Sequence, residues 1–120
     1  MISIVSPLLR IQNQLRIYHW QTTSYAEHKA FGKTYENLDD LIDTFIEAFF
    51  GKYGRSKAKL SFNIELRNYE DGVNEFIETS IEYLRNFNSE LDTSSDSELL
   101  NIRDEMIAEF DRLKYLLTLK

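Results

Sequence analysis

The chain of 120 residues has no cysteine, one proline, four glycines and no long apolar run. The lack of cysteine excludes disulfides, thiolate zinc sites and thiol nucleophiles. No stretch approaches the roughly 18 apolar residues that a membrane-spanning helix needs. The first residues show neither the basic region nor the apolar segment of a signal peptide. We therefore expect a soluble, cytoplasmic protein that forms one domain.

Positive charge is also scarce. The chain carries 14 Lys and Arg against 20 Asp and Glu, for a formal net charge of -6, and a negative surface repels phosphate backbones. One basic cluster is expected in a solvated polar loop; it comprises Lys52, Arg55, Lys57 and Lys59. Neither a nucleic-acid partner nor a membrane partner is therefore predicted.

Apolar residues recur at spacings of three and four, which is typical of amphipathic helices. The pattern predicts four helices, at about residues 7–22, 25–50, 68–88 and 96–118. Ser6, Ser24 and Ser95 are the expected N-terminal caps, and Gly51 is expected to end the second helix. Gly32 inside that helix is a weak point, which costs about 1 kcal/mol relative to alanine.

The connection between the second and third predicted helices is long and less regular, with a short helical turn expected near residues 60–64. It can cross the end of the molecule or run along it, so two arrangements of the helices remain open. In either case the predicted fold is all-α, an antiparallel four-helix bundle.

Both histidines of the chain flank one turn. His19 ends the first predicted helix and His28 begins the second, whereas Asp43 and Glu47 share a face further along the second helix. Imidazole and carboxylate groups bind iron, zinc and manganese. Fifteen helical residues span roughly 22 Å, so one chain cannot bring all four groups to one ion. Two copies about a two-fold axis can, which predicts at least a dimer through the first two helices, with two equivalent sites.

The segment from His19-Trp20 through His28 to Asp43 and Glu47 resembles the iron-oxidation signature of the Dps-type mini-ferritins, members of the ferritin-like superfamily. The resemblance implies a ferritin-like bundle in which His19, His28, Asp43 and Glu47 bind iron, or another divalent metal, between subunits. It also implies Trp20 as a neighbouring redox-active ring, and Fe(II) oxidation or sequestration as the activity. More loosely, the chain resembles small phage-encoded helical proteins.

Two other interpretations remain open. The first is a helical bundle without enzymatic activity or cofactor, kept for its shape or for a partner, in which aromatic residues outside the apolar stripes form an interaction surface: Trp20, Tyr25, Phe50 and Tyr53. The second is a magnesium-dependent all-α nucleotide pyrophosphohydrolase, because such enzymes use paired acidic residues on neighbouring helices. The candidate pairs lie in Glu36-Asn37-Leu38-Asp39 and Glu75-Phe76-Ile77-Glu78.

Overall fold

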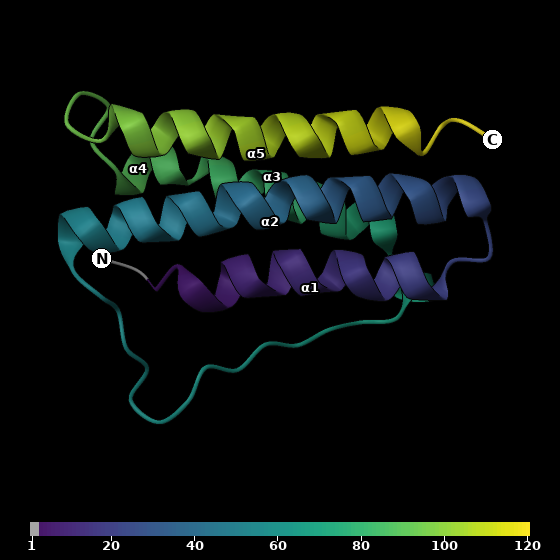
Figure 1. Ribbon diagram of the computed structural model, residues 1–120, viewed down its shortest axis with the longest axis horizontal. Helices are drawn as coiled ribbons and strands as arrows, with labels where there is room; N and C mark the ends of the chain where they lie inside the picture. The colour runs from purple at the N-terminus through teal and green to yellow at the C-terminus, as the bar shows by residue number, and fades with distance from the viewer. Residues whose placement is uncertain (1–2) are drawn as a thin grey trace.

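The structure is a computed structural model that describes residues 3–120 (Figure 1). Its elements are α1 (Val5–Gln21), α2 (Tyr25–Tyr53), the 3-10 helix η1 (Tyr69–Asp71), α3 (Val73–Arg85), the short α4 (Phe87–Glu90) and α5 (Ser97–Leu116). No strand occurs among these described residues, so the all-α prediction is confirmed. Within the same range, no helix is both long enough and apolar enough to cross a membrane.

Two antiparallel hairpins build the molecule: α1 with α2, and α3 with α5 (Figure 1). Residues 54–68, which we call the crossover, run back along the bundle beside α1, so that α2 and α3 point in the same direction. Neighbouring long helices are antiparallel, as the sequence predicts. Of the two paths left open for the long connection, the structure takes the one along the bundle.

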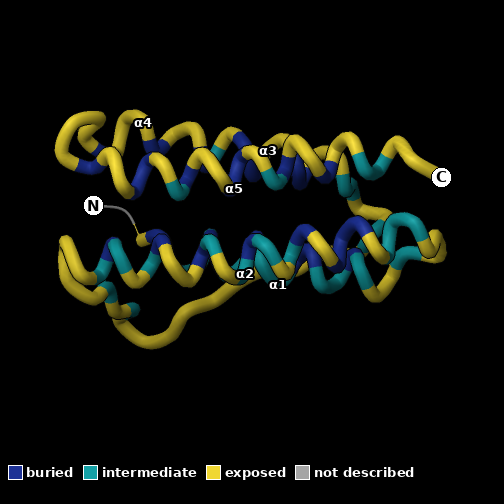
Figure 2. The backbone as a smooth tube through the Cα atoms, turned by 45° about the horizontal axis from the view of Figure 1, so that its top comes forward, coloured by how far each residue is buried: buried dark blue, intermediate teal, exposed yellow. Residues whose placement is uncertain are grey.

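The core lies between the two hairpins, where the buried faces of the helices meet (Figure 2). Burial of each large apolar side chain stabilises the fold by about 1.5–3 kcal/mol. These residues lie at the predicted helical spacing, and those with no measurable exposure include Leu8, Leu15, Phe31, Leu38, Phe45, Leu84, Leu99 and Phe110.

The ends of α2 show how local chemistry sets helix boundaries. Ser24 caps its start, since the Ser24 hydroxyl accepts a hydrogen bond from the Glu27 N–H at 3.2 Å. The expected stop at Gly51 is wrong, because α2 continues to Tyr53 and ends at Gly54. Gly54 has a φ of +92°, a conformation that glycine adopts without steric cost.

The starts of α1 and α5 differ from the prediction by one residue or two. α1 begins at Val5 with Ile4 as its N-cap residue, so Ser6 lies inside the first turn. Pro7, the next residue, is tolerated in this turn because the N–H groups of the first turn have no helical partner. α5 begins at Ser97, so Asp96 and not Ser95 is the N-cap residue.

The predicted helix at 68–88 is broken into three pieces. Gly72 adopts a φ of +115° between η1 and α3, and α4 follows α3 after Asn86. The helical turn expected near residues 60–64 is also wrong, because no residue there is helical. The apolar residues of the crossover occur at every second position from Leu60 to Leu66, which is the period of extended backbone.

Candidate functional site

The short turn between α1 and α2 stacks the two histidine rings on each other. The centroids of His19 and His28 are 3.8 Å apart, and the ring planes differ by 17°. The Nδ1 atom of His19 lies 2.7 Å from the His28 carbonyl oxygen, and the Nδ1 atom of His28 lies 2.8 Å from the His19 carbonyl oxygen. A carbonyl can only accept, so both Nδ1 atoms donate, and each neutral ring keeps its Nε2 lone pair. Histidines that bind metals through Nε2 use the same supporting hydrogen bond.

Gly32 makes room for this pair. A Cβ atom added at Gly32 would lie 2.9 Å from Cε1 of His19, closer than ordinary packing allows. Tyr35 packs edge-on against the His19 ring, with its ring centroid 5.3 Å from that of His19. The weak point predicted inside α2 is therefore where the His19 ring packs.

Asp43 and Glu47 lie exposed on α2, beyond the middle of the helix. The Asp43 carboxyl raises the pKa of Glu47. The larger cause is a hydrogen bond between the two side chains, and the smaller is the negative charge of Asp43. The fifteen residues from His28 to Asp43 keep the histidines and carboxylates roughly 22 Å apart. Within residues 3–120, no three His, Asp or Glu side chains are close enough to hold one metal ion. One chain thus brings the histidines together and the carboxylates together, but not both pairs.

A hollow beside Asp43 is lined mostly by acidic and aliphatic side chains and has a volume of about 350 Å³. Its lining residues are Leu9, Gln12, Asp39, Asp40, Ile42, Asp43 and Ile46. One carboxylate oxygen of Asp39, Oδ2, accepts a hydrogen bond from Arg16 at 2.6 Å. The other, Oδ1, is buried and has no hydrogen-bond partner among the described residues. The hollow therefore offers negative charge that this chain only partly neutralises.

The acidic pairs of the hydrolase interpretation do not converge in one chain. Asp39 is bound to Arg16, and Glu78 is bound to Lys114 at 2.7 Å. Glu36 and Glu75 are exposed. The part of the chain that the structure describes contains no cluster of carboxylates able to hold a metal ion. The structure thus gives this interpretation no assembled magnesium site.

The four aromatic residues of the interaction interpretation have different environments. Trp20 and Tyr25 are 68% and 73% exposed beside the histidine turn, so both remain available to a partner. Phe50 is half-buried against the core. The Tyr53 hydroxyl donates a hydrogen bond to Asp96 at the opposite end of the bundle. Trp20 and Tyr25 are therefore the most exposed of the four, whereas Tyr53 is 49% exposed with its hydroxyl already bound.

Asp96 organises that opposite end. It is buried, and it accepts from Lys52 at 2.8 Å and from the Asp92 N–H at 2.8 Å. The Lys52 ammonium and the Tyr53 hydroxyl hold the pKa of Asp96 below its usual value. Lys52 therefore belongs to α2 and to an ion pair with the start of α5, which corrects the expectation of a solvated loop cation.

Sequence reasoning missed Gln14, which is fully buried in α1. Its amide nitrogen donates to the Arg67 carbonyl at 2.8 Å, and its amide oxygen accepts from the Arg67 N–H at 2.7 Å. Gln14 thereby fixes the end of the crossover to α1. A polar residue on the apolar stripe between Ile11 and Leu15 was the signal that could have revealed it.

The fold and these contacts define a small all-helical bundle of two hairpins joined by a long crossover. Residues 19–117 match a family described as "Family of unknown function (DUF5856)". Because the match spans most of the chain, the protein belongs to that family.

The chain is also similar to a protein of Enterobacteria phage T4 described as "Uncharacterized 14.6 kDa protein in mobD-ri intergenic region". The two are 42% identical over 48 residues, a stretch that covers 40% of this chain and only 38% of the phage protein. No solved structure matches the chain. The similarity to a phage protein agrees with the looser of the two resemblances noted in the sequence.

Proposed function

We propose that the protein is a ferritin-like bundle that binds a divalent transition metal, Fe(II) first among them, between two copies of the chain. The observation that carries the proposal is the histidine pair, whose Nδ1 atoms are both held by carbonyl oxygens. This arrangement fixes the ring positions and leaves two Nε2 lone pairs at one corner of the bundle. Zn(II) and Mn(II) suit the same mixture of nitrogen and oxygen ligands.

A two-fold dimer would complete the site. In such a dimer, His19 and His28 of one copy face Asp43 and Glu47 of the other, and the same contact occurs twice. The acidic hollow beside Asp43 lies near the middle of α2, away from the end of the α1–α2 hairpin that carries the histidines. The single long crossover also supports the proposal, because ferritin-like bundles carry one such connection.

Each group has a distinct role in the proposed site. The imidazoles donate electron pairs to the metal, and the two carboxylates supply negative charge, which favours Fe(III) over Fe(II) electrostatically. Trp20 follows His19 directly, as the resemblance to the mini-ferritins requires of a neighbouring redox-active ring. Oxidation of the bound Fe(II) by oxygen or peroxide is the activity that the resemblance implies, and it depends on the binding step.

Complementation between two variants tests the proposal. We expect His19→Ala/His28→Ala and Asp43→Asn/Glu47→Gln each to bind Zn(II) and anaerobic Fe(II) at least about tenfold more weakly than the wild type. Refolding equal amounts of the two variants together should restore about a quarter of the wild-type sites, because half the dimers are mixed and each mixed dimer has one complete site. Equilibrium dialysis measures the sites, and sedimentation velocity measures the dimer.

The control is Glu36→Gln/Glu105→Gln, which removes the same charge from exposed positions of α2 and α5. It should bind metal as the wild type does. The proposal fails if the wild type binds no metal, if either site variant binds at wild-type affinity, or if mixing restores nothing.

One observation favours a second function, an interaction module that pairs copies through the crossover. Its apolar side chains alternate with polar ones and are exposed, Leu60 almost completely (98%) and Phe62 by 44%. In an antiparallel pair centred on Phe62, Leu60 of one copy would face Ile64 of the other, and Lys59 would face Glu65. The segment is therefore complementary to itself, which favours a second copy as the partner.

Phe62→Glu separates the two functions. It should abolish pairing through the crossover, because it places two like charges opposite each other at the centre of the ribbon. It should leave metal binding through the histidines unchanged. Dimers that survive Phe62→Glu, measured by sedimentation velocity, would exclude the crossover as the interface.

A further inference from the structure

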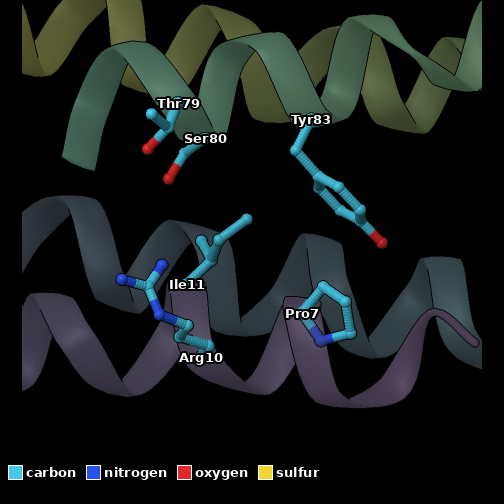
Figure 3. Close-up of a pocket in the computed structure, with 6 residues that line it drawn as sticks. All are labelled: Pro7, Arg10, Ile11, Thr79, Ser80 and Tyr83. Atoms are coloured by element: carbon cyan, nitrogen blue, oxygen red, sulfur yellow. The ribbon is translucent and has the colours of Figure 1, made fainter. Parts of the chain in front are cut away.

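A pocket of about 170 Å³ lies between α1 and α3 (Figure 3). Pro7, Arg10 and Ile11 line it from α1, and Thr79, Ser80 and Tyr83 line it from α3. None of these residues belongs to the proposed metal site. An engineered protein cavity of about 150 Å³ holds one benzene molecule, so the pocket has room for one small ring.

Two hydroxyl groups in this pocket have no partner. Ser80 is 97% buried (3% exposed), and both its Oγ atom and the Tyr83 hydroxyl are buried without a hydrogen-bond partner within residues 3–120. By contrast, the neighbouring Thr79 hydroxyl donates to the Phe76 carbonyl at 3.1 Å. Buried polar groups in folded proteins are normally hydrogen-bonded, so two unpaired hydroxyls on residues that line one pocket indicate a ligand. Burial raises the pKa of Tyr83 to about 12, so its hydroxyl remains a donor at neutral pH.

Arg10 adds an unpaired positive charge. Its Nε atom donates to the Glu65 carbonyl at 3.0 Å, but no carboxylate among the described residues lies within ion-pair distance of its guanidinium. Four other arginines have such carboxylate partners, namely Arg16, Arg67, Arg103 and Arg112. Arg55 and Arg85 also have none among the described residues, but neither of them lines this pocket. In a chain of net charge -6, an arginine without an acidic partner beside two unpaired hydroxyls is suited to a bound anion.

We propose that this pocket binds a small aromatic carboxylate. The carboxylate accepts from the terminal nitrogens of Arg10 and from the Ser80 hydroxyl, whose oxygen points toward Arg10 (Figure 3). The ring packs against Pro7 and Ile11. The Tyr83 hydroxyl lies at the far end of the pocket from Arg10, so a ring with a second polar group opposite its carboxylate would pair both hydroxyls.

Titration of the full chain, followed by amide chemical shifts in NMR, tests the proposal with benzoate, 4-hydroxybenzoate and the neutral analogue benzamide. We expect 4-hydroxybenzoate to bind most tightly and benzamide most weakly, with the largest shifts at the pocket residues. Arg10→Gln should weaken benzoate binding at least about tenfold while changing benzamide binding little, because it removes charge-assisted hydrogen bonds. Tyr83→Phe should abolish the advantage of 4-hydroxybenzoate over benzoate.

Arg85→Gln is the matched control, because it removes the same charge from an exposed position of α3. It should leave benzoate binding unchanged. Arg10→Lys keeps the charge and so guards against a general loss of structure at Arg10; it should bind benzoate between the wild type and Arg10→Gln. The proposal is overturned if benzoate does not shift the pocket residues, if benzamide binds as tightly as benzoate, or if Arg85→Gln weakens binding as much as Arg10→Gln.

Discussion

The two sides of α1 are built in opposite ways. Toward α2, the rings of His19 and His28 stack, both Nδ1 atoms are hydrogen-bonded, and Gly32 lets the helices approach. Toward α3, the hydroxyls of Ser80 and Tyr83 are buried without partners beside a pocket of about 170 Å³. At the histidine turn the first side is hydrogen-bonded and fixed, although further along α2 the Oδ1 atom of Asp39 is buried without a partner. The second side has two buried hydroxyls without partners among the described residues.

The connections between the helices explain this difference. α1 and α2 are joined by a turn of three residues, so polar groups at the turn can lock both helices at once. α1 and α3 are joined only through α2 and the crossover, and side chains of α1 hold the end of the crossover. A fixed side suits a metal site, which needs its ligands in place, and an incompletely paired side suits a small ligand.

The largest effect on stability is expected from Gln14→Met, where α1 holds the crossover. Methionine is unbranched and similar in length, so it keeps the packing but loses both hydrogen bonds to Arg67. We expect the free energy of unfolding to fall by about 2 kcal/mol, about 1 for each hydrogen bond. Urea denaturation measures this loss, and hydrogen exchange should become faster at the Arg67 amide.

Gln21→Met is the control for this change. Gln21 also makes two hydrogen bonds, accepting from the Tyr69 N–H at 2.7 Å and donating to Asn68 at 2.9 Å, but it is exposed. Water can replace its partners, so we expect a loss of only about 0.5 kcal/mol. Equal losses at the two positions would show that burial of Gln14 does not matter.

On the α2 side, Gly32→Ala tests whether the histidine pair is rigid. Alanine favours helix by about 1 kcal/mol over glycine, but its Cβ would lie 2.9 Å from His19. The His19 ring can move only by giving up its hydrogen bond and its stacking on His28. We therefore expect a net destabilisation of about 1 kcal/mol, because overpacking of this kind typically costs 1–3 kcal/mol. Thermal or urea unfolding measures it.

The effect of Gly32→Ala on stability should change sign when the His19 ring is absent. In the His19→Ala background, Gly32→Ala should stabilise the protein by about 1 kcal/mol, the intrinsic preference of the helix. Gly51→Ala in the wild type should also stabilise it, because nothing lies within 4 Å of a Cβ atom at Gly51. If Gly32→Ala destabilises both backgrounds equally, His19 is not the reason for the glycine.

Much of the fold could be predicted from the sequence because helices are set by local pattern. The stripe that includes Leu15 and Tyr18 is buried, and Ser24 caps α2 as its spacing from Glu27 predicts. The path of the crossover could not be predicted, since it depends on contacts with residues more than 50 positions away, such as Gln14 with Arg67. The break at Gly72 depends on a single left-handed residue that the helical pattern does not reveal.

The candidate site, like the fold, could be predicted only in part. The spacing of His19 and His28 around one turn was enough to bring them together. Their exchange of hydrogen bonds with each other's carbonyls was not foreseen, because it depends on ring orientation and not on sequence separation. Ser80 was missed because its position on an apolar helix face suggests a small core residue. That its hydroxyl has no partner depends on which side chains of the neighbouring helix surround it, and the sequence does not give these.

An effect of similar size and opposite sign is expected from Ser80→Ala. Leaving a buried hydroxyl unpaired typically costs 1–3 kcal/mol, so its removal should stabilise the ligand-free protein by about 1 kcal/mol. Thr34→Val is the matched change at a satisfied hydroxyl, since Thr34 is buried and donates to the Ala30 carbonyl at 2.9 Å. It should destabilise the protein by about 1 kcal/mol. Urea denaturation of both variants compares them, and a destabilising Ser80→Ala would mean that Ser80 has a partner.

The last effect is a dependence of stability on pH that arises from Tyr83 on α3. Burial raises the pKa of Tyr83 from 10.0 to about 12, so between these values the folded protein keeps a proton that the unfolded chain has lost. Stability from this group is therefore complete below pH 10 and falls as the pH rises toward about 12. Other tyrosines titrate in the same range, so the informative quantity is the difference between the wild type and Tyr83→Phe. Urea midpoints measured just below pH 10 and near pH 12 should fall less in Tyr83→Phe, and an identical fall would show that the Tyr83 hydroxyl is reached by water.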